Sequence, residues 1–355
     1  MILKIAVLSG DGIGPEVTEQ SIKVLKSLGK KFNHKIELES GLVGAVAIDK
    51  YNDPYPDETH QVCLNSDAIL FGAIGDPKYD NDPKAKVRPE QGLLKMRKKL
   101  GLYANLRPTK VFESLLEMSP IKEERISGTD ILFVRELTGG IYFGERGRKD
   151  NENFAFDTCE YNRDEIIRIA KIGFEYAQKR SSKLCCVDKA NVLETSRLWR
   201  ETVQSMEKNY PNIEVSYEFV DAVAMRLVQW PNSYDVLITS NLFGDILTDE
   251  ASVISGSMGL MPSASVGSKN ALYEPIHGSY PEAAGKNIAN PIASILSLSM
   301  MLDHSFNLKK ESEIINKAVE ESLKNKYVTP DLSSDKNSFS TDQVGDYIVD
   351  FIEKN

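Results

Sequence analysis

Short apolar runs alternate with amphipathic segments along much of the chain, and this alternation constrains the possible folds most strongly. The runs have the length and composition of buried strands and lie at 4–8, 68–72, 131–135, 183–188 and 235–240. The segments with helical periodicity lie at 15–29, 164–180, 196–208, 292–302, 309–324 and 342–354. Strands that alternate with helices indicate an α/β fold in which helices flank a sheet.

Composition and charge exclude several classes of protein. The chain has 355 residues, enough for roughly two domains, and its net charge of -9 offers no basic surface for nucleic acid or an anionic membrane. The apolar segment 292–302 is shorter than the ~20 residues that span a bilayer, and the N-terminal residues form a strand and turn rather than a signal peptide. The 4 cysteines form no C-x-x-C pattern, which predicts reduced thiols in a cytoplasmic protein.

Two stretches depart from the alternation of strands and helices. Residues 76–89 are polar and rich in proline, aspartate and lysine, so we expect a loop there. Residues 140–162 combine aromatic and polar residues without helical periodicity, which predicts a protruding hairpin or arm. Neither stretch has the low complexity of a linker, and composition by itself marks no domain boundary.

A glycine-rich turn follows the first expected strand. A strand, a glycine-rich turn and a helix are also the parts of a dinucleotide-binding fingerprint. The spacing differs here, because Gly10 and Gly12 are followed by Pro15 at the position where the fingerprint has its third glycine. We therefore favour a tight turn with positive φ, followed by a helix that has Pro15 in its first position and ends at Gly29.

An acidic pair, Asp245 and Asp249, follows the expected strand 235–240. In a helix both carboxylates lie on one face, one turn apart, where like charges repel unless a cation binds between them. Carboxylate oxygens are the ligands that Mg²⁺ and Mn²⁺ prefer, and open α/β sheets bind ligands beyond the carboxyl ends of their strands. The pair therefore predicts a metal site, with a solvated helix face as the alternative.

Three arginines stand at positions suited to a carboxylate substrate. Arg135 ends the strand 131–135, where a guanidinium cannot lose its proton to escape burial. Arg97 and Arg107 precede it in separate segments. Because a guanidinium pairs with a carboxylate through two parallel hydrogen bonds, the three could bind an acidic substrate. Salt bridges within the chain are the alternative.

Three further side chains suit acid–base or metal chemistry. Lys189 closes an apolar strand, and a desolvated lysine can act as a general base near neutral pH. Tyr142 could donate a phenolic proton, and Asp221 offers a third acid. The alternatives are a surface lysine, a packing tyrosine and a helix N-cap.

The segment Glu274–Glu282 is expected to be a loop that runs into a helix. Ser279 and Glu282 fit the S-x-x-E capping box, and Pro281 fits the first turn of the helix. In the alternative interpretation the loop binds an adenosine, and Glu282 accepts hydrogen bonds from the ribose hydroxyls. The residues by themselves favour the capping box.

Five segments together resemble the β-decarboxylating dehydrogenase family, and the resemblance runs from Lys4 to the C-terminus. The segments lie in a specific order and spacing at 10–16, 104–108, 135–144, 187–192 and 241–251. The resemblance implies a two-domain, non-Rossmann α/β fold with a mixed, twisted sheet. Residues 1–102 and 256–355 would form a cofactor-binding domain, and 103–255 an inserted domain for substrate, metal and dimerisation. The arm at about 140–162 would contact the second subunit of a homodimer.

The same resemblance implies roles for individual residues. Lys189 and Tyr142 would be catalytic. The residues expected to bind the substrate are Arg97, Arg107, Arg135, Asp221, Glu90, Leu93 and Leu94. The expected ligands of Mg²⁺ or Mn²⁺ are Asp221, Asp245 and Asp249, and Lys189 and Asp221 would reach the site of the partner subunit. The residues expected to bind the cofactor are His277, Gly278, Ser279, Glu282 and Asn290.

Two features of the sequence narrow the expected substrate and cofactor. Glu90, Leu93 and Leu94 match the pattern in which an apolar wall receives an isopropyl group, and leucines would disfavour the third carboxylate of isocitrate. The acid at Glu282 would repel the 2′-phosphate of NADP, so NAD is expected. The implied reaction is oxidative decarboxylation of (2R,3S)-3-isopropylmalate to 2-oxoisocaproate and CO2, in leucine biosynthesis. The alternatives are a tartrate or D-malate dehydrogenase of the same family, or a metal-dependent hydroxyacid lyase without nicotinamide.

Overall fold

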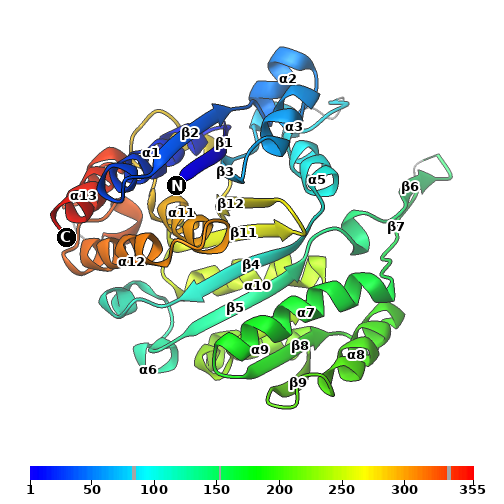
Figure 1. The fold of residues 1–355 in the computed structure, drawn as a ribbon. Helices are drawn as coiled ribbons and strands as arrows, with labels where there is room; N and C mark the ends of the chain where they lie inside the picture. Colours follow the sequence, from blue (N-terminus) through cyan, green and yellow to red (C-terminus); the bar gives the residue numbers. More distant parts are fainter. Residues whose placement is uncertain (82–84, 152, 334–336) are drawn as a thin grey trace. The chain divides into compact units, whose positions relative to one another are not determined.

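The structure is a computed structural model that describes residues 1–81, 85–151, 153–333 and 337–355 (Figure 1). Its contacts divide the chain into two compact units, Met1–Leu102 with Gly256–Asn355, and Tyr103–Ser255. The first unit is discontinuous in the sequence because the second is inserted into it. Within the described ranges, the structure contains no helix that is long and apolar enough to cross a membrane.

The first unit contains a mixed sheet whose strands follow the order β2-β1-β3-β12-β11. Their bounds are β1 (Ile2–Gly10), β2 (Lys35–Ser40), β3 (Ala68–Ala73), β11 (Pro262–Gly267) and β12 (Ala271–Pro275). β1 is parallel to β2 and β3, β12 is parallel to β3, and β11 is antiparallel to β12. Strands from the two ends of the chain therefore lie side by side in one sheet.

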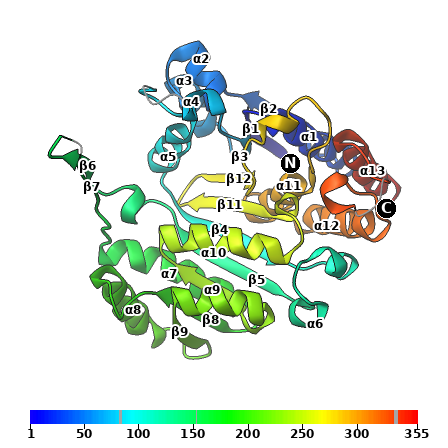
Figure 2. The ribbon, with the colours of Figure 1, turned by 180° about the vertical axis from the view of Figure 1, so that it is seen from behind.

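Helices cover both faces of this sheet. They are α1 (Gly14–Lys31), α2 (Ala45–Tyr51), α3 (Asp57–Leu64), α4 (Pro77–Asp80), α5 (Pro89–Leu100), α11 (Ile292–His304), α12 (Lys309–Lys324) and α13 (Thr341–Lys354). Because successive strand residues point to opposite faces, Ile69 and Phe71 pack with α3 and α5 in one buried cluster. Gly72 faces α1 instead, where a β-carbon would lie 2.7 Å from the hydroxyl oxygen of Thr18. α1 contacts α11 and α13, and α12 contacts α11 and α13 (Figure 2).

The second unit contains strands in the order β4-β5-β10-β8-β9. Their bounds are β4 (Leu102–Lys110), β5 (Asp130–Glu136), β8 (Lys183–Asp188), β9 (Glu214–Phe219) and β10 (Val236–Thr239). β4 is antiparallel to β5, and the other neighbours are parallel. The carboxyl ends of four parallel strands therefore meet at one edge of the sheet, and several of the predicted site residues follow them directly in the sequence.

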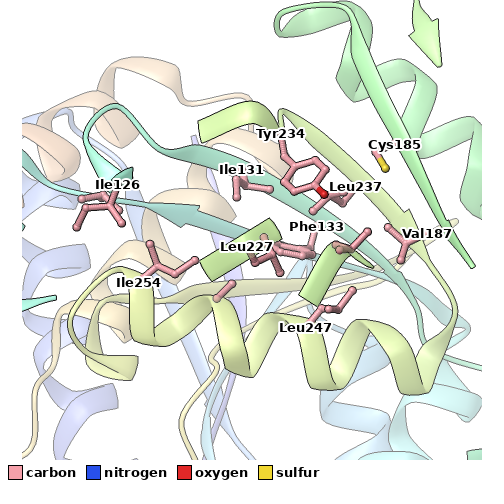
Figure 3. Packing of buried hydrophobic residues seen from close by; sticks show 13 residues of the cluster. Ile126, Ile131, Phe133, Cys185, Val187, Leu227, Tyr234, Leu237, Leu247 and Ile254 are labelled. Carbon is pink, nitrogen blue, oxygen red and sulfur yellow. The ribbon is translucent and has the colours of Figure 1, made fainter. Parts of the chain in front are cut away.

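The helices of the second unit hold that edge in position. They are α6 (Glu123–Ile126), α7 (Arg163–Lys179), α8 (Glu194–Glu207), α9 (Val220–Gln229) and α10 (Asn241–Ile254). Phe133 and Leu237 of the sheet pack against Leu227 of α9 and Leu247 of α10, as Figure 3 shows. Each such side chain stabilises the fold by about 1.5–3 kcal/mol when it is fully buried. Because Leu247 anchors α10 to the sheet, Asp245 and Asp249 are carried on the part of the helix that the core does not cover.

The hairpin expected within 140–162 is confirmed. β6 (Arg146–Lys149) and β7 (Phe154–Asp157) pair in antiparallel register, and the hairpin projects from the second unit in Figure 1. Phe154 is exposed at the start of β7. Residue 152 lies outside the described ranges. The contact of this arm with a second subunit stays a prediction.

The prediction that Gly29 ends the first helix is wrong. α1 continues to Lys31, and the chain leaves it through Asn33, which has a φ of 55°. Gly29 is buried inside the helix, and a β-carbon there would lie 2.9 Å from Cγ1 of Ile36. The glycine therefore serves close packing of α1 against the start of β2 rather than helix termination.

The predicted loop at 76–89 is partly wrong as well. α4 forms within it and is capped by Asp76, whose Oδ1 accepts a hydrogen bond of 2.9 Å from the backbone N–H of Lys78. Pro89 is already the first residue of α5, consistent with the preference of proline for the first helical turn. Residues 82–84 of the predicted loop lie outside the described ranges.

Candidate active site

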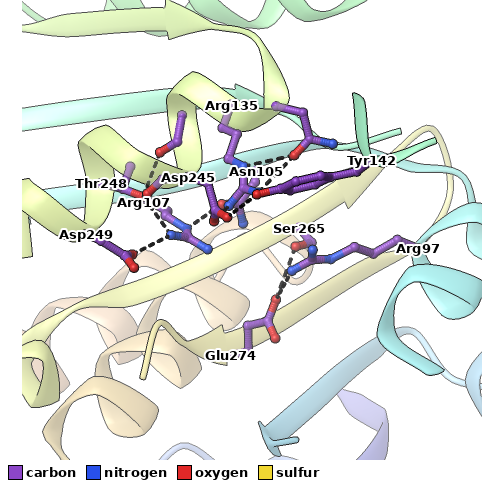
Figure 4. Close-up of polar contacts among 12 residues, drawn as sticks. Arg97, Asn105, Arg107, Arg135, Tyr142, Asp245, Thr248, Asp249, Ser265 and Glu274 are labelled. Carbon is purple, nitrogen blue, oxygen red and sulfur yellow. Dashed lines mark hydrogen bonds and ion pairs between the residues drawn. The ribbon is translucent and has the colours of Figure 1, made fainter. Parts of the chain in front are cut away.

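Asp245 and Asp249 lie one turn apart on α10, which begins immediately after β10 (Figure 4). Oδ1 of Asp245 accepts a short hydrogen bond from Arg135, and its Oδ2 accepts one of 2.7 Å from the Tyr142 hydroxyl. Asp249 pairs with Nη1 of Arg107 at 3.6 Å, and 61% of its side chain is exposed. Each acid of the pair therefore faces one arginine of the second unit.

The two carboxyls differ in their electrostatics. Burial opposes ionisation of Asp245, but Arg135, the Tyr142 hydroxyl and Arg107 together hold its pKa below the ordinary value. Desolvation and the charge of Asp245 raise the pKa of Asp249, and Arg107 offsets this only in part. A divalent cation bound between the two carboxylates would stabilise the ionised form of both.

Arg135 is buried at the end of β5 and is held by the first residue of α10. Its Nε and Nη2 donate hydrogen bonds of 3.2 and 2.9 Å to Oδ1 of Asn241. Gly244 allows the helix to approach, because a β-carbon there would lie 2.8 Å from Cβ of Arg135. The guanidinium is therefore fixed in direction before any ligand binds.

Arg107 is held in a similar way on β4. Nε donates a hydrogen bond of 2.7 Å to Oδ1 of Asn105, and Nη1 donates one of 2.6 Å to the hydroxyl of Thr248. Asn105 lies two residues before Arg107, so both side chains point to the same face of the strand. Thr248 belongs to the same helix as the acidic pair, which joins the second arginine to α10.

Tyr142 lies in a short turn of 3-10 helix, Gly140–Tyr142, that follows β5. Desolvation and the hydrogen bond to Asp245 raise the pKa of its hydroxyl to about 12. The phenol is therefore protonated at neutral pH and directed at the acidic pair, as a proton donor requires.

Lys189 and Asp221 form a second polar pair in this unit. Nζ of Lys189 donates a hydrogen bond of 2.5 Å to Oδ1 of Asp221 and lies 5.7 Å from the centre of the Phe219 ring. That hydrogen bond lowers the pKa of the exposed Asp221 carboxyl. The N-cap alternative for Asp221 is wrong, because the residue lies inside α9 and Phe219 occupies the N-cap position.

The structure does not bring all three predicted metal ligands together within one chain. Across 1–81, 85–151, 153–333 and 337–355, no group of three or more histidine, cysteine, aspartate or glutamate side chains is arranged to hold a metal ion. Asp245 and Asp249 are neighbours on α10, whereas Asp221 belongs to α9 and pairs with Lys189. A three-acid site therefore needs a further contribution, which the expected homodimer would supply.

One face of α5 carries the predicted substrate wall in the first unit. Glu90, Leu93, Leu94 and Arg97 have the spacing of residues that share a helix face, and Leu93 packs partly against the buried cluster. Arg97 is buried and donates a hydrogen bond of 3.2 Å to Oε1 of Glu274 (Figure 4). Its Nε is buried with no hydrogen-bond partner in the described part of the chain, which leaves one donor available for an acidic ligand.

The loop after β12 contradicts the capping-box interpretation. Pro281–Ala283 is one turn of 3-10 helix whose N-cap, Tyr280, has a φ of 39° and makes no side-chain cap. The carbonyl of the buried Ser279 instead accepts a hydrogen bond of 2.8 Å from the backbone N–H of Ile13. Glu282 is exposed and free of a capping role, which leaves its carboxylate available for a ligand.

Two other predicted cofactor residues flank this loop. Nδ1 of His277 lies 3.0 Å from the carbonyl oxygen of Gly278, and burial lowers the pKa of the ring, so the imidazole is neutral near pH 7. Nε2 of His277 is buried and has no hydrogen-bond partner among the described residues. Asn290 is already engaged, because it donates to Asp331 at 3.0 Å and accepts from the N–H of Ile292 at 3.0 Å. His277 is therefore the better candidate for direct contact with a ligand.

The glycine turn supports the same loop. Gly10 and Gly12 have φ values of 69° and 57°, as expected of a tight turn with positive φ. A β-carbon at Gly12 would lie 2.9 Å from Cβ of Ser279. The carboxylate of Asp11, between these glycines, accepts hydrogen bonds from the first two backbone N–H groups of α2 and from one in the loop after β3. The turn is thus a structural support for the predicted cofactor loop.

Comparison with known proteins gives consistent similarities. The family model described as isocitrate/isopropylmalate dehydrogenase matches residues 4–348. A 3-isopropylmalate dehydrogenase from Bacteroides fragilis is 55% identical over 355 residues, covering 100% of each chain. One from Aquifex aeolicus is 53% identical over 99% of this chain and 97% of its own.

Solved structures extend the similarity to the fold. An isocitrate dehydrogenase from Methylococcus capsulatus has a TM-score of 0.89 and 33% identity, with 99% of each chain covered. A beta-decarboxylating dehydrogenase from Thermococcus kodakarensis, in its apo form, has a TM-score of 0.81 and 35% identity over 99% of this chain and 96% of its own. The expected α/β fold, with mixed sheets flanked by helices, is confirmed.

Proposed function

This chain belongs to the isocitrate/isopropylmalate dehydrogenase family of decarboxylating oxidoreductases, and we propose that it oxidises and decarboxylates (2R,3S)-3-isopropylmalate with NAD in leucine biosynthesis. The products are 2-oxoisocaproate, CO2 and NADH. The observation that carries the proposal is the acidic pair of α10, in which Asp245 and Asp249 each face an arginine. Such a site combines ligands for a cation with positively charged groups for the carboxylates of a malate.

The substrate is bound by the three arginines and by the wall of α5. Arg97, Arg107 and Arg135 pair with the two carboxylates, which suits guanidinium groups that are buried and held in direction by neighbouring side chains. Leu93 and Leu94 receive the isopropyl group. A third carboxylate, as in isocitrate, would lose hydration against these leucines without gaining a partner.

Asp221, Asp245 and Asp249 hold Mg²⁺ or Mn²⁺ in this proposal. The residues present fit such an ion, because the donor set consists of carboxylate oxygens and two of the three acids lie one turn apart on α10. A divalent cation at this position supplies Lewis-acid stabilisation of negative charge on the substrate oxygen during loss of CO2.

Lys189 and Tyr142 carry the proton transfers. As the neutral amine, Lys189 would accept the proton of the C2 hydroxyl through Asp221 and water. The nicotinamide, when bound, would accept the hydride from C2. After the bond to CO2 breaks, the Tyr142 hydroxyl assists protonation of C3. Its raised pKa keeps the proton on the phenol until the carbanion-like carbon forms.

The active form is a homodimer with shared sites. Lys189 and Asp221 of one subunit complete the site of the other, in agreement with their separation from the α10 pair within one chain. Large apolar side chains are exposed on the two adjacent helices α9 and α10, namely Met225, Val228, Ile246 and Val253. An exposed apolar surface of this kind favours burial against a second copy. The 140–162 arm contributes to the same contact.

NAD is the proposed cofactor, bound by the loop from His277 to Glu282 with Gly278, Ser279 and Asn290. The unpaired Nε2 of His277 and the exposed Glu282 carboxylate fit an adenosine, whose ribose hydroxyls donate to a carboxylate. The proposed location is the cytoplasm, because all four cysteines are free and two of them are adjacent and buried.

Replacing Glu282 with lysine should reverse the cofactor preference. Loss of the carboxylate that accepts from the ribose weakens NAD binding, and the new ammonium group attracts the 2′-phosphate of NADP. The ratio of kcat/KM for NAD to that for NADP should therefore fall by roughly 100-fold. Initial rates with each cofactor measure the ratio. The matched control, Glu282→Gln, removes the charge without adding one and should give an intermediate ratio. An unchanged ratio in both variants would exclude a cofactor contact at this position.

An assay of NADH production with 3-isopropylmalate tests the function directly. We expect substrate-dependent NADH formation that a chelator abolishes. The kcat/KM for D-malate should be lower by roughly 100-fold, because D-malate has no isopropyl group to pack against the leucines of α5. A clear preference for D-malate would identify a dehydrogenase of the tartrate and D-malate type instead. Consumption of a hydroxyacid without NADH would identify a lyase.

A further inference from the structure

Tyr161 contacts both the turn that carries Tyr142, the proposed proton donor, and the helix that carries two of the three proposed metal ligands. It belongs to the segment between β7 and α7, and its ring is packed edge-on against Trp199, with centroids 5.3 Å apart. Its hydroxyl accepts a hydrogen bond of 2.9 Å from the backbone N–H of Asn241, the first residue of α10. The side chain therefore has a fixed ring and a single directed contact to the helix.

The other side of Tyr161 lies against the turn that ends in Tyr142. A β-carbon at Gly139 would lie 2.7 Å from Cε1 of Tyr161, and one at Gly140 would lie 2.8 Å from its Cζ. Gly140 has a φ of 73°, and its N–H donates a hydrogen bond of 3.0 Å to the carbonyl of Glu160, the residue before Tyr161. The two glycines thus let the backbone of the turn rest directly on the tyrosine ring.

Two further side chains, Asn241 and Glu136, hold the turn in place. Nδ2 of Asn241 donates a hydrogen bond of 3.2 Å to the carbonyl of Gly139, while its Oδ1 holds Arg135. The fully buried carboxylate of Glu136 accepts hydrogen bonds of 2.8 Å from the N–H groups of both Thr138 and Gly139. The turn is therefore fixed to β5 at one side and to the start of α10 at the other.

We propose that Tyr161 is a positioning residue that holds the turn of Tyr142 against α10 and thereby sets the contact between the Tyr142 hydroxyl and Asp245. The inference rests on the proposed role of Tyr142 in protonation. Removing the Tyr161 hydroxyl leaves the first N–H of α10 without its acceptor, and the turn and the helix lose their common support. The displacement affects the step that needs Tyr142, whereas the cofactor loop belongs to the other compact unit.

The test is a double-mutant cycle on the full-length homodimer, with Tyr161→Phe, Tyr142→Phe and the double variant. We expect Tyr161→Phe to lower kcat roughly tenfold, to change the KM for NAD less than about twofold, and to cause no further loss in the Tyr142→Phe background. The matched control is Tyr234→Phe, which removes another hydroxyl of the same unit, bonded to Glu218 at 3.0 Å. This control should retain full kcat.

Independent losses that multiply in the double variant would overturn the proposal, and so would an unchanged kcat in Tyr161→Phe. If Tyr161→Phe does not fold, Glu136→Gln tests the same turn from its other side and should show the same absence of a further loss with Tyr142→Phe. If the wild-type enzyme forms no NADH from 3-isopropylmalate, this result contradicts the proposed function and not the positioning role of Tyr161. A crystal structure of Tyr161→Phe then decides the positioning role, because the 2.7 Å contact from Tyr142 to Asp245 must lengthen.

Discussion

Replacing Lys189 with alanine is expected to lower kcat by roughly a thousandfold, within the range of ~10²–10⁴ that general acid–base catalysis contributes. The methyl group cannot take the C2 hydroxyl proton, and Asp221 loses the partner that holds it at 2.5 Å. The fold should be unaffected, because Lys189 follows β8 and its ammonium group contacts an exposed carboxylate. Single-turnover NADH formation and the thermal unfolding midpoint measure the two properties separately.

Two variants make this result specific. Lys183→Ala changes an exposed lysine at the opposite end of the same strand and should keep normal kcat. Lys189→Arg keeps the positive charge but cannot release a proton to act as a base, so it should be nearly as inactive as Lys189→Ala. Normal turnover in Lys189→Ala would remove the lysine from the mechanism, whereas normal turnover in Lys189→Arg would reduce its role to charge.

The second large effect is expected at the metal ligands. Asp249→Ala should lower kcat by about 10³-fold, which corresponds to ~4 kcal/mol of transition-state stabilisation, and should weaken Mn²⁺ binding measured by calorimetry. Asp249 suits this experiment better than Asp245 because its side chain is 61% exposed and its ion pair with Arg107 is loose, at 3.6 Å, so its removal disturbs little else. Asp245 also holds Arg135 and Tyr142.

Removing the metal should have the same effect as removing its ligand. A chelator should abolish NADH formation by the wild-type enzyme, and excess Mg²⁺ or Mn²⁺ should restore it. The matched control is Glu250→Gln, the next acid on α10, which is expected to keep both activity and Mn²⁺ affinity. Full activity in the presence of chelator would contradict a metal site formed by the α10 pair.

The sequence was most informative where one strong local signal acts alone. The apolar runs predicted β3 and β8 with nearly correct bounds, because a buried strand of a parallel sheet needs a continuous run. Gly29 misled because a glycine near a helix end can serve either termination or close packing, and only the neighbouring Ile36 distinguishes the two. The loop at Ser279 misled because Tyr280 adopts a positive φ that its residue type does not suggest.

The supporting residues of the candidate site were the part that sequence reasoning missed. Asn105 and Thr248 hold Arg107, and Asn241 holds Arg135, yet none of them carries a charge that would draw attention. Spacing offers a weak signal, since Asn105 stands two residues from Arg107 on a strand. Glu274 offers none, because its contact with Arg97 joins residues that are 177 positions apart.

The insertion of one unit into the other has a consequence for synthesis on the ribosome. All strands and helices of Tyr103–Ser255 are available once residue 255 has emerged, so this unit can fold while the chain is still growing. β3 must wait for β12, its parallel neighbour, because the whole inserted unit and β11 lie between them in the sequence. At ~5–20 residues per second this wait lasts on the order of ten seconds or more. During that time the β3 edge is unprotected, so nascent chains should depend on chaperones at this stage more than at any later one.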